Sequence, residues 1–138
     1  MLYVLLEIYM SKWINPTSDL IRSWAYDAES CEPEQDWDII IHHLPFEHLY
    51  SELAADKNCP KADYFLDLLY FTIGYSVRLG LSESNLARIQ YVVDATKRVE
   101  SYLLHIFRTR VHKLLEDPSL FSYDDWCCGG HTKRDSSH

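Results

Sequence analysis

The chain has 138 residues, a length suited to one domain with a single core, and its 47% hydrophobic and 25% charged residues exclude a disordered chain. Its net charge of −8 is uneven: residues 1–69 carry 13 acidic and 4 basic side chains, whereas residues 70–138 carry 8 and 9. Because the first half would repel a polyanion, we expect no direct binding to nucleic acid and favour a basic protein partner.

The elements predicted before residue 60 are helices, since glycine and proline are scarce and the sequence has no hairpin turn signal. Four helices are expected here: residues 2–13, 19–29, 36–44 and 45–56. A capping side chain precedes the second helix at Thr17, Ser18 or Asp19. Asp36 is placed to cap the third helix, and Pro45 suits the first turn of the fourth.

Two longer helices are predicted after residue 60. Residues 60–79 are apolar on nearly all sides, which is typical of a central buried helix, and Gly80 is its expected end. A serine cap then starts a long helix over residues 83–115, along most of which apolar side chains keep three-to-four spacing. The weak stretch from Asp94 to Arg98 is compatible with a kink or a partly exposed turn. Pro118 closes this helix, and a short turn follows.

The chain closes with a polar segment, residues 127–138, which is predicted to be a mobile tail. The predicted fold is therefore a single all-α domain over residues 1–126, a bundle of about five or six helices with a long C-terminal helix. The four cysteines are expected to be reduced, because the sequence has neither a secretory signal nor an apolar run as long as a membrane span. We therefore expect a cytoplasmic protein without a membrane segment.

Residues 27–38, DAESCEPEQDWD, hold six acidic side chains and no basic one. Asp36 and Asp38 are explained by the helix that follows, as its cap and its first-turn acid. The three glutamates then remain without a predicted structural role, beside aromatic side chains of the kind that anchor protein interfaces. The predicted partner-binding residues are Tyr26, Glu29, Glu32, Glu34, Trp37 and Asp38.

A catalytic interpretation of this segment is disfavoured, because acid–base catalysis usually needs one carboxyl in an apolar pocket and these acids crowd a polar stretch. A metal-dependent enzyme is an alternative: Asp38 and His42 have i, i+4 spacing, His48 follows, and such ligands suit zinc, iron or manganese. Polar residues with this spacing are also typical of the rim of a core. Cys127 and Cys128 are adjacent, which is poor spacing for one tetrahedral ion. We therefore expect no catalytic residue, no metal site and no cofactor.

Six basic side chains fall within the predicted long helix: Arg88, Lys97, Arg98, Arg108, Arg110 and Lys113. They are compatible with a basic binding edge, and also with a solvated helix face that pairs with the acidic segment of the same molecule. The second interpretation competes with partner binding, because acids already paired internally would not be free to attract another protein.

Three stretches, WAYD (24–27), EPEQDWD (32–38) and CPKADYFLDLLYFTIGYSVR (59–78), resemble a pattern of small uncharacterised helical proteins from proteobacteria. This resemblance carries no chemistry and therefore no residue roles. In size and charge the chain is also similar to immunity proteins, which neutralise bacterial toxins.

The sequence thus favours a non-enzymatic binding protein that occludes a basic protein partner. Its most concrete form is an immunity protein whose carboxylates take the place of substrate phosphates in the cationic cleft of a nuclease toxin. Two alternatives remain: the metal-dependent enzyme, and a structural or chaperone-like module that forms a homodimer through the apolar N-terminal helix.

Overall fold

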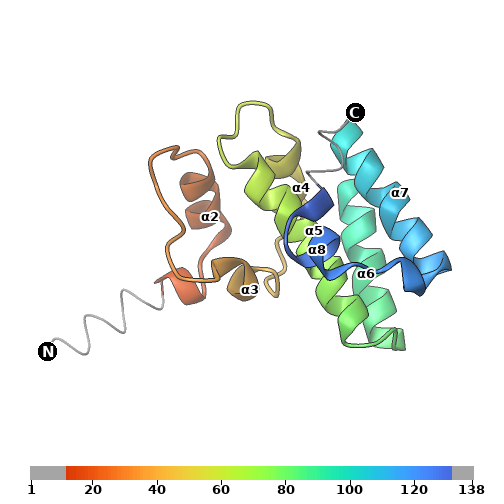
Figure 1. The fold of residues 1–138 in the computed structure, drawn as a ribbon. Coiled ribbons are helices and arrows are strands. Elements are labelled where there is room, and N and C mark those ends of the chain that lie inside the picture. Colours follow the sequence, from red (N-terminus) through yellow and green to blue (C-terminus); the bar gives the residue numbers. More distant parts are fainter. Residues whose placement is uncertain (1–11, 132–138) are drawn as a thin grey trace, which may run out of the picture.

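The computed structural model describes residues 12–131, and all regular structure in this range is helical (Figure 1). The elements are α2 Ser18–Ala25, α3 Trp37–Ile41, α4 Glu47–Ala55, α5 Ala62–Arg78, α6 Glu83–Thr96, α7 Tyr102–Glu116, the 3₁₀-helix η1 Pro118–Leu120 and α8 Tyr123–Cys127. The predicted all-α fold is confirmed. No helix in the described range is both long and apolar enough to cross a membrane.

α2 begins where the capping pattern predicts, because the Thr17 hydroxyl accepts a hydrogen bond from the Leu20 N–H at 3.1 Å. The helix ends at Ala25, earlier than predicted. Asp27 explains the early end, since its carboxylate accepts a hydrogen bond from the Glu29 N–H at 3.1 Å and so forms a separate turn.

The other two helices predicted in this region are also shifted at their ends. α3 ends at Ile41 instead of residue 44, and α4 starts at Glu47, two residues after Pro45. The helix predicted over residues 2–13 lies mostly outside the described residues. Residues 12–14, where the described chain begins, are helical.

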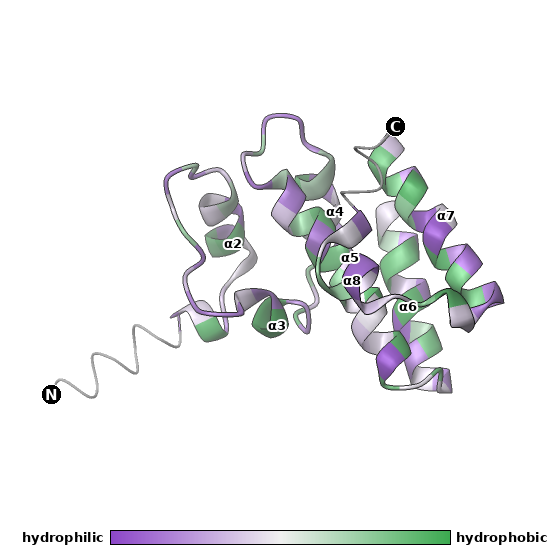
Figure 2. Ribbon diagram, in the orientation of Figure 1, coloured by the Kyte–Doolittle hydropathy of each residue, from purple (hydrophilic) through white to green (hydrophobic). Residues whose placement is uncertain are grey.

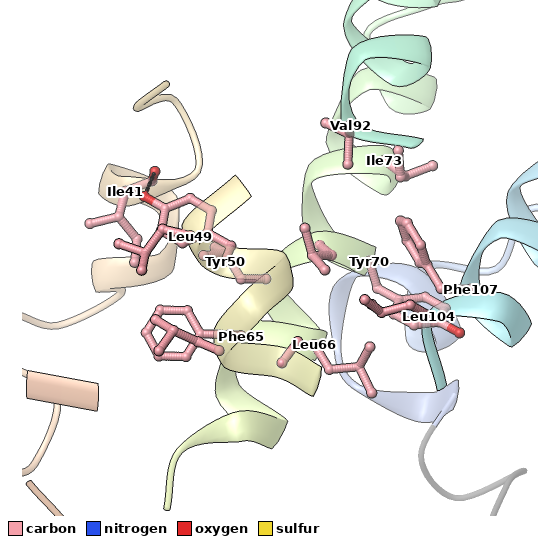
Figure 3. Close-up of a cluster of buried hydrophobic side chains, with 14 of the residues drawn as sticks. Ile41, Leu49, Tyr50, Phe65, Leu66, Tyr70, Ile73, Val92, Leu104 and Phe107 are labelled. Carbon is pink, nitrogen blue, oxygen red and sulfur yellow. Dashed lines mark hydrogen bonds between the residues drawn. The ribbon is translucent and has the colours of Figure 1, made fainter. Parts of the chain in front are cut away.

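α5 lies at the centre of the molecule, with α4, α6 and α8 packed against it (Figure 1). Its Phe65 stacks on Tyr50 of α4, and its Tyr70 meets Phe107 of α7 edge to face (Figure 3). In Figure 2, α7 alternates between hydrophobic and hydrophilic colours, the pattern of a helix with one buried side. Gly80 ends α5 with a φ of 103°, as expected of a residue without a Cβ.

The prediction of one long helix over residues 83–115 is wrong, because the chain forms the two helices α6 and α7. α6 stops at Thr96, whose buried hydroxyl turns back to a carbonyl of its own helix. Ser101 then caps α7 by accepting a hydrogen bond from the Leu104 N–H. Arg108 donates to the Thr96 backbone oxygen at 3.0 Å and so satisfies a carbonyl at the open end of α6.

Part of the segment predicted to be a mobile tail packs against the core. His131 is almost completely buried, and its ring stacks on Tyr70 with centroids 3.7 Å apart. The His131 Nε2 atom lies 2.7 Å from a carboxylate oxygen of Asp67. Residues 127–131 therefore belong to the folded domain, and residues 132–138 lie outside the described residues.

Candidate functional site

The acidic segment forms the connection between α2 and α3, here called the acidic loop (residues 26–36) (Figure 1). A side chain of α2 holds its backbone, since the Trp24 indole N–H donates a hydrogen bond to the Cys31 carbonyl at 2.9 Å. The Lys61 ammonium group donates to the Trp24 carbonyl at 2.7 Å and lies 3.7 Å from the centre of the Trp24 ring. The acidic loop is therefore held in a defined conformation by hydrogen bonds and is not a fully solvated charged segment.

Glu32 has a structural role that the sequence analysis did not assign. One of its carboxylate oxygens accepts hydrogen bonds from the Trp37 N–H at 2.7 Å and from the Tyr64 hydroxyl at 3.0 Å. Asp36, which was predicted to cap α3, has a left-handed backbone with φ 56° and makes no capping hydrogen bond through its side chain. Glu32 thus replaces Asp36 as the side chain that satisfies the start of α3.

The prediction that Trp37 anchors a partner is wrong, because its side chain is 0% exposed. Its ring meets Trp24 edge to face, with centroids 4.8 Å apart, and lies 6.4 Å from the Tyr64 ring. Its indole N–H donates to the Trp13 carbonyl at 2.7 Å. Trp37 is therefore a core residue that joins α3 to the chain before α2 and to α5.

Asp38 lies in the first turn of α3 and is partly buried. This burial raises the pKa of Asp38 above its ordinary value, and the charges of Glu32 and Asp36 act in the same direction. The structure therefore places Asp38 at the margin of the exposed surface.

Three of the predicted residues are exposed or partly exposed and take no part in α3 or its start. Tyr26 is 42% exposed, and its hydroxyl donates to the carboxylate of Asp56, which raises the pKa of Tyr26 to about 12. Glu29 is exposed and Glu34 is partly exposed. We call these three residues, Tyr26, Glu29 and Glu34, the acidic surface.

The basic residues of α6 and α7 do not neutralise the acidic surface. Arg88 forms an ion pair with Glu47 of α4, and Lys97 lies 3.3 Å from Asp94 of its own helix. In the part of the chain that the structure describes, neither glutamate of the acidic surface has an ion pair. Internal pairing between the two charged regions is therefore absent from residues 12–131.

The alternative metal ligands Asp38, His42 and His48 are not brought together. His42 is 3% exposed, and its ring packs 3.8 Å from that of His43 and against aromatic side chains of α5. His48 instead lies beside Tyr91 of α6, with ring centroids 6.2 Å apart. Among the described residues, no three His, Cys, Asp or Glu side chains are arranged to share a metal ion.

The buried ion pair between Glu47 and Arg88 is not predicted by the sequence, because both residues occupy positions typical of solvated helix faces. Glu47 is only 2% exposed, and the Arg88 guanidinium also donates to the His42 carbonyl at 2.7 Å. Burial of His42, together with the charges of His43 and Arg88, lowers the pKa of His42 to about 3. Its ring is therefore neutral at physiological pH.

The acidic loop carries two carboxylates that are exposed or partly exposed, and an exposed aromatic ring whose hydroxyl is already bonded. Such an arrangement can bind cationic side chains of another protein and shield them from water. Comparison with protein-family models, with curated protein sequences and with solved structures finds no match to this chain.

Proposed function

We propose that this protein is a non-enzymatic binding protein that occludes a basic protein partner through the acidic surface. The observation that carries the proposal is that Glu29 and Glu34 have no ion pair within the described residues, although their loop is firmly held. An ordered loop loses little conformational entropy on binding, so its carboxylates contribute more of their interaction energy to affinity.

Tyr26 and Trp37 are the two aromatic residues predicted to contact a partner, and Tyr26 is the exposed one, so we assign the anchor role to Tyr26. Its exposed ring offers apolar area, and the hydrogen bond to Asp56 restricts its orientation before a partner arrives. The two glutamates supply long-range attraction to a basic surface, which speeds encounter and discriminates against acidic partners.

The most concrete form of this function is an immunity protein that blocks the cationic cleft of a nuclease toxin. The first half of the chain has 13 acidic and only 4 basic residues, and this negative charge supports a basic target. In this mechanism, the carboxylates of Glu29 and Glu34 bind the side chains that would hold substrate phosphates, and Tyr26 slows dissociation.

The test is affinity capture from extracts of the cells that produce the protein, followed by titration of the purified partner. The variant Glu29→Lys/Glu34→Lys is compared with Glu83→Lys/Glu116→Lys, which changes the net charge equally at other sites. We expect the first variant to raise the Kd at least about tenfold at low salt, and the second to have little effect. Equal Kd values for the two variants would overturn the proposal.

A further inference from the structure

The connection between α6 and α7 forms a groove of about 570 Å³, which lies within the range of small-molecule sites, roughly 300–1,000 Å³. Its lining comes from this connection and from the first turns of α7: Lys97, Arg98, Val99, Glu100, Ser101, Tyr102, His105 and Arg108. None of these residues belongs to the acidic surface. α6 and α7 lie on the other side of α5 from α2, so the groove is separate from the acidic loop (Figure 1).

Hydrogen bonds hold the walls of the groove in place. The Val99 N–H donates to the Thr96 carbonyl at 3.3 Å, which closes the turn after α6. The Arg108 guanidinium donates to the backbone oxygen of Thr96 at 3.0 Å and to its hydroxyl at 3.3 Å. A ligand therefore meets an arginine whose orientation is already restricted, which lowers the entropy lost on binding.

Cationic side chains outnumber acidic ones in the lining. The cations are Lys97, Arg98 and Arg108, and the acid is Glu100. Arg108 is bonded only to neutral oxygens of Thr96, and in the described part of the chain neither arginine of the groove forms an ion pair. Lys97 lies 3.3 Å from Asp94, but both side chains are more than half exposed, so this pair is weak.

The excess of positive charge indicates the kind of anion that the groove can hold. The three cations and one carboxylate of the lining leave a net charge of +2. A phosphate monoester, with a charge of about −1.5 to −2 at neutral pH, balances this charge. The planar guanidinium groups of Arg98 and Arg108 also match the geometry of phosphate oxygens.

Tyr102 adds an aromatic ring to the lining. It is 77% exposed, the largest exposed fraction among the large hydrophobic residues of the described chain. An exposed ring beside cationic side chains offers a face on which a flat aromatic group can stack. The groove therefore combines a phosphate-binding part with a stacking part.

We propose that this groove binds a small phosphate monoester that carries a flat aromatic group, the chemistry of a nucleoside monophosphate. The aromatic group stacks on Tyr102, and the phosphate oxygens accept charge-assisted hydrogen bonds from Arg98 and Arg108. A single phosphate differs from nucleic acid, whose many phosphates the acidic first half of the chain would repel. The site does not depend on the function proposed above.

The experiment titrates the full chain with AMP, with adenosine, which lacks the phosphate, and with ribose 5-phosphate, which lacks the base. The amide signals of residues 97–102 are followed by NMR. We expect saturable shifts with AMP and a Kd at least about fivefold lower than for either fragment. Absence of saturable shifts with AMP would overturn the proposal, and so would equal Kd values for AMP and either fragment.

Variants at exposed positions test the two parts of the groove separately. Arg98→Gln should reduce the advantage of AMP over adenosine at least about threefold, whereas the control Lys113→Gln should preserve it. Tyr102→Ala should remove the advantage of AMP over ribose 5-phosphate, whereas the control Tyr91→Ala should preserve it. An equal effect of either variant and its control would overturn the proposal.

Discussion

The Glu32 carboxylate accepts a hydrogen bond from the Trp37 N–H, with 2.7 Å between oxygen and nitrogen. This contact divides the acidic segment into two kinds of carboxylate. Glu32 stabilises the start of α3 and holds the Tyr64 hydroxyl, so its charge is committed within the molecule. Glu29 and Glu34 have no such role, and they are the glutamates that remain for a partner.

Replacing Glu32 by alanine is expected to lower the free energy of unfolding by about 1–2 kcal/mol, because the Trp37 N–H and the Tyr64 hydroxyl lose their acceptor. Glu29→Ala and Glu34→Ala serve as controls and should change it by less than about 0.5 kcal/mol. Urea denaturation monitored by tryptophan fluorescence measures the difference. A Glu32→Ala variant as stable as the two controls would contradict the capping role.

The buried ion pair between Glu47 and Arg88 predicts a larger effect. Arg88→Met should cost roughly 3 kcal/mol, because it leaves the Glu47 carboxylate buried without a counter-charge. The double variant Glu47→Gln/Arg88→Met should cost clearly less than the sum of the two single changes. The matched control is the exposed pair of Arg22 and Glu52, where Arg22→Met should cost less than about 1 kcal/mol. Additive losses in the Glu47 and Arg88 cycle would show that the pair is not coupled.

The low pKa of His42 predicts a specific pH dependence. The unfolded chain binds a proton at His42 below its ordinary pKa of 6.5, whereas the folded protein does so only near 3. Stability therefore falls as the pH decreases from 6.5 towards 3, by up to about 1.4 kcal/mol per pH unit from this residue. His42→Phe should flatten the dependence, and the control His105→Asn, at an exposed histidine of α7, should not. If NMR shows the His42 ring titrating near pH 6.5 in the folded protein, the prediction fails.

α8 packs closely against α5 at Gly74, and this predicts a local effect on α8. Gly74→Ala should cost about 1–3 kcal/mol, since the new Cβ would lie 2.9 Å from the Trp126 Cβ and force the two helices apart. Hydrogen exchange should then show increased opening of α8 amides. Gly80→Ala is the matched control: it strains a positive φ but meets no atom within 4 Å, so α8 should keep its local protection. Equal protection of α8 in both variants would rule out the proposed packing.

The sequence predicted the helical class and the central helix α5, because both depend on composition and on periodic apolar positions. It failed at the break between α6 and α7, where the apolar stripe continues on both sides. The break depends on Ser101 as a cap and on the contact of Arg108 with the Thr96 carbonyl, which joins residues twelve positions apart. The weak apolar stretch from Asp94 to Arg98 and the capping residue Ser101 were the local signals, whereas the arginine contact exists only once the two helices pack together.

The candidate site was predicted only in part, again because some of its contacts join residues that are far apart in the sequence. Acidic residues next to aromatic ones indicated an interface, but sequence alone does not separate an exposed aromatic from a buried one. Trp37 is buried because Trp24, Tyr64 and Trp13 surround it, and these come from three separate parts of the chain. The role of Glu32 was missed because it accepts the Trp37 N–H from five positions earlier, outside the usual capping position, and its second partner Tyr64 lies 32 positions away.

The most direct test of the central claim is site-specific photo-cross-linking in the cells that produce the protein. A benzophenone-bearing amino acid replaces Glu29 or Glu34 in separate variants, and Glu83 or Glu116 in the controls. We predict that positions 29 and 34 cross-link to the same basic protein and that the control positions do not. Cross-links to that protein from positions 83 and 116, with none from 29 and 34, would contradict binding through the acidic surface.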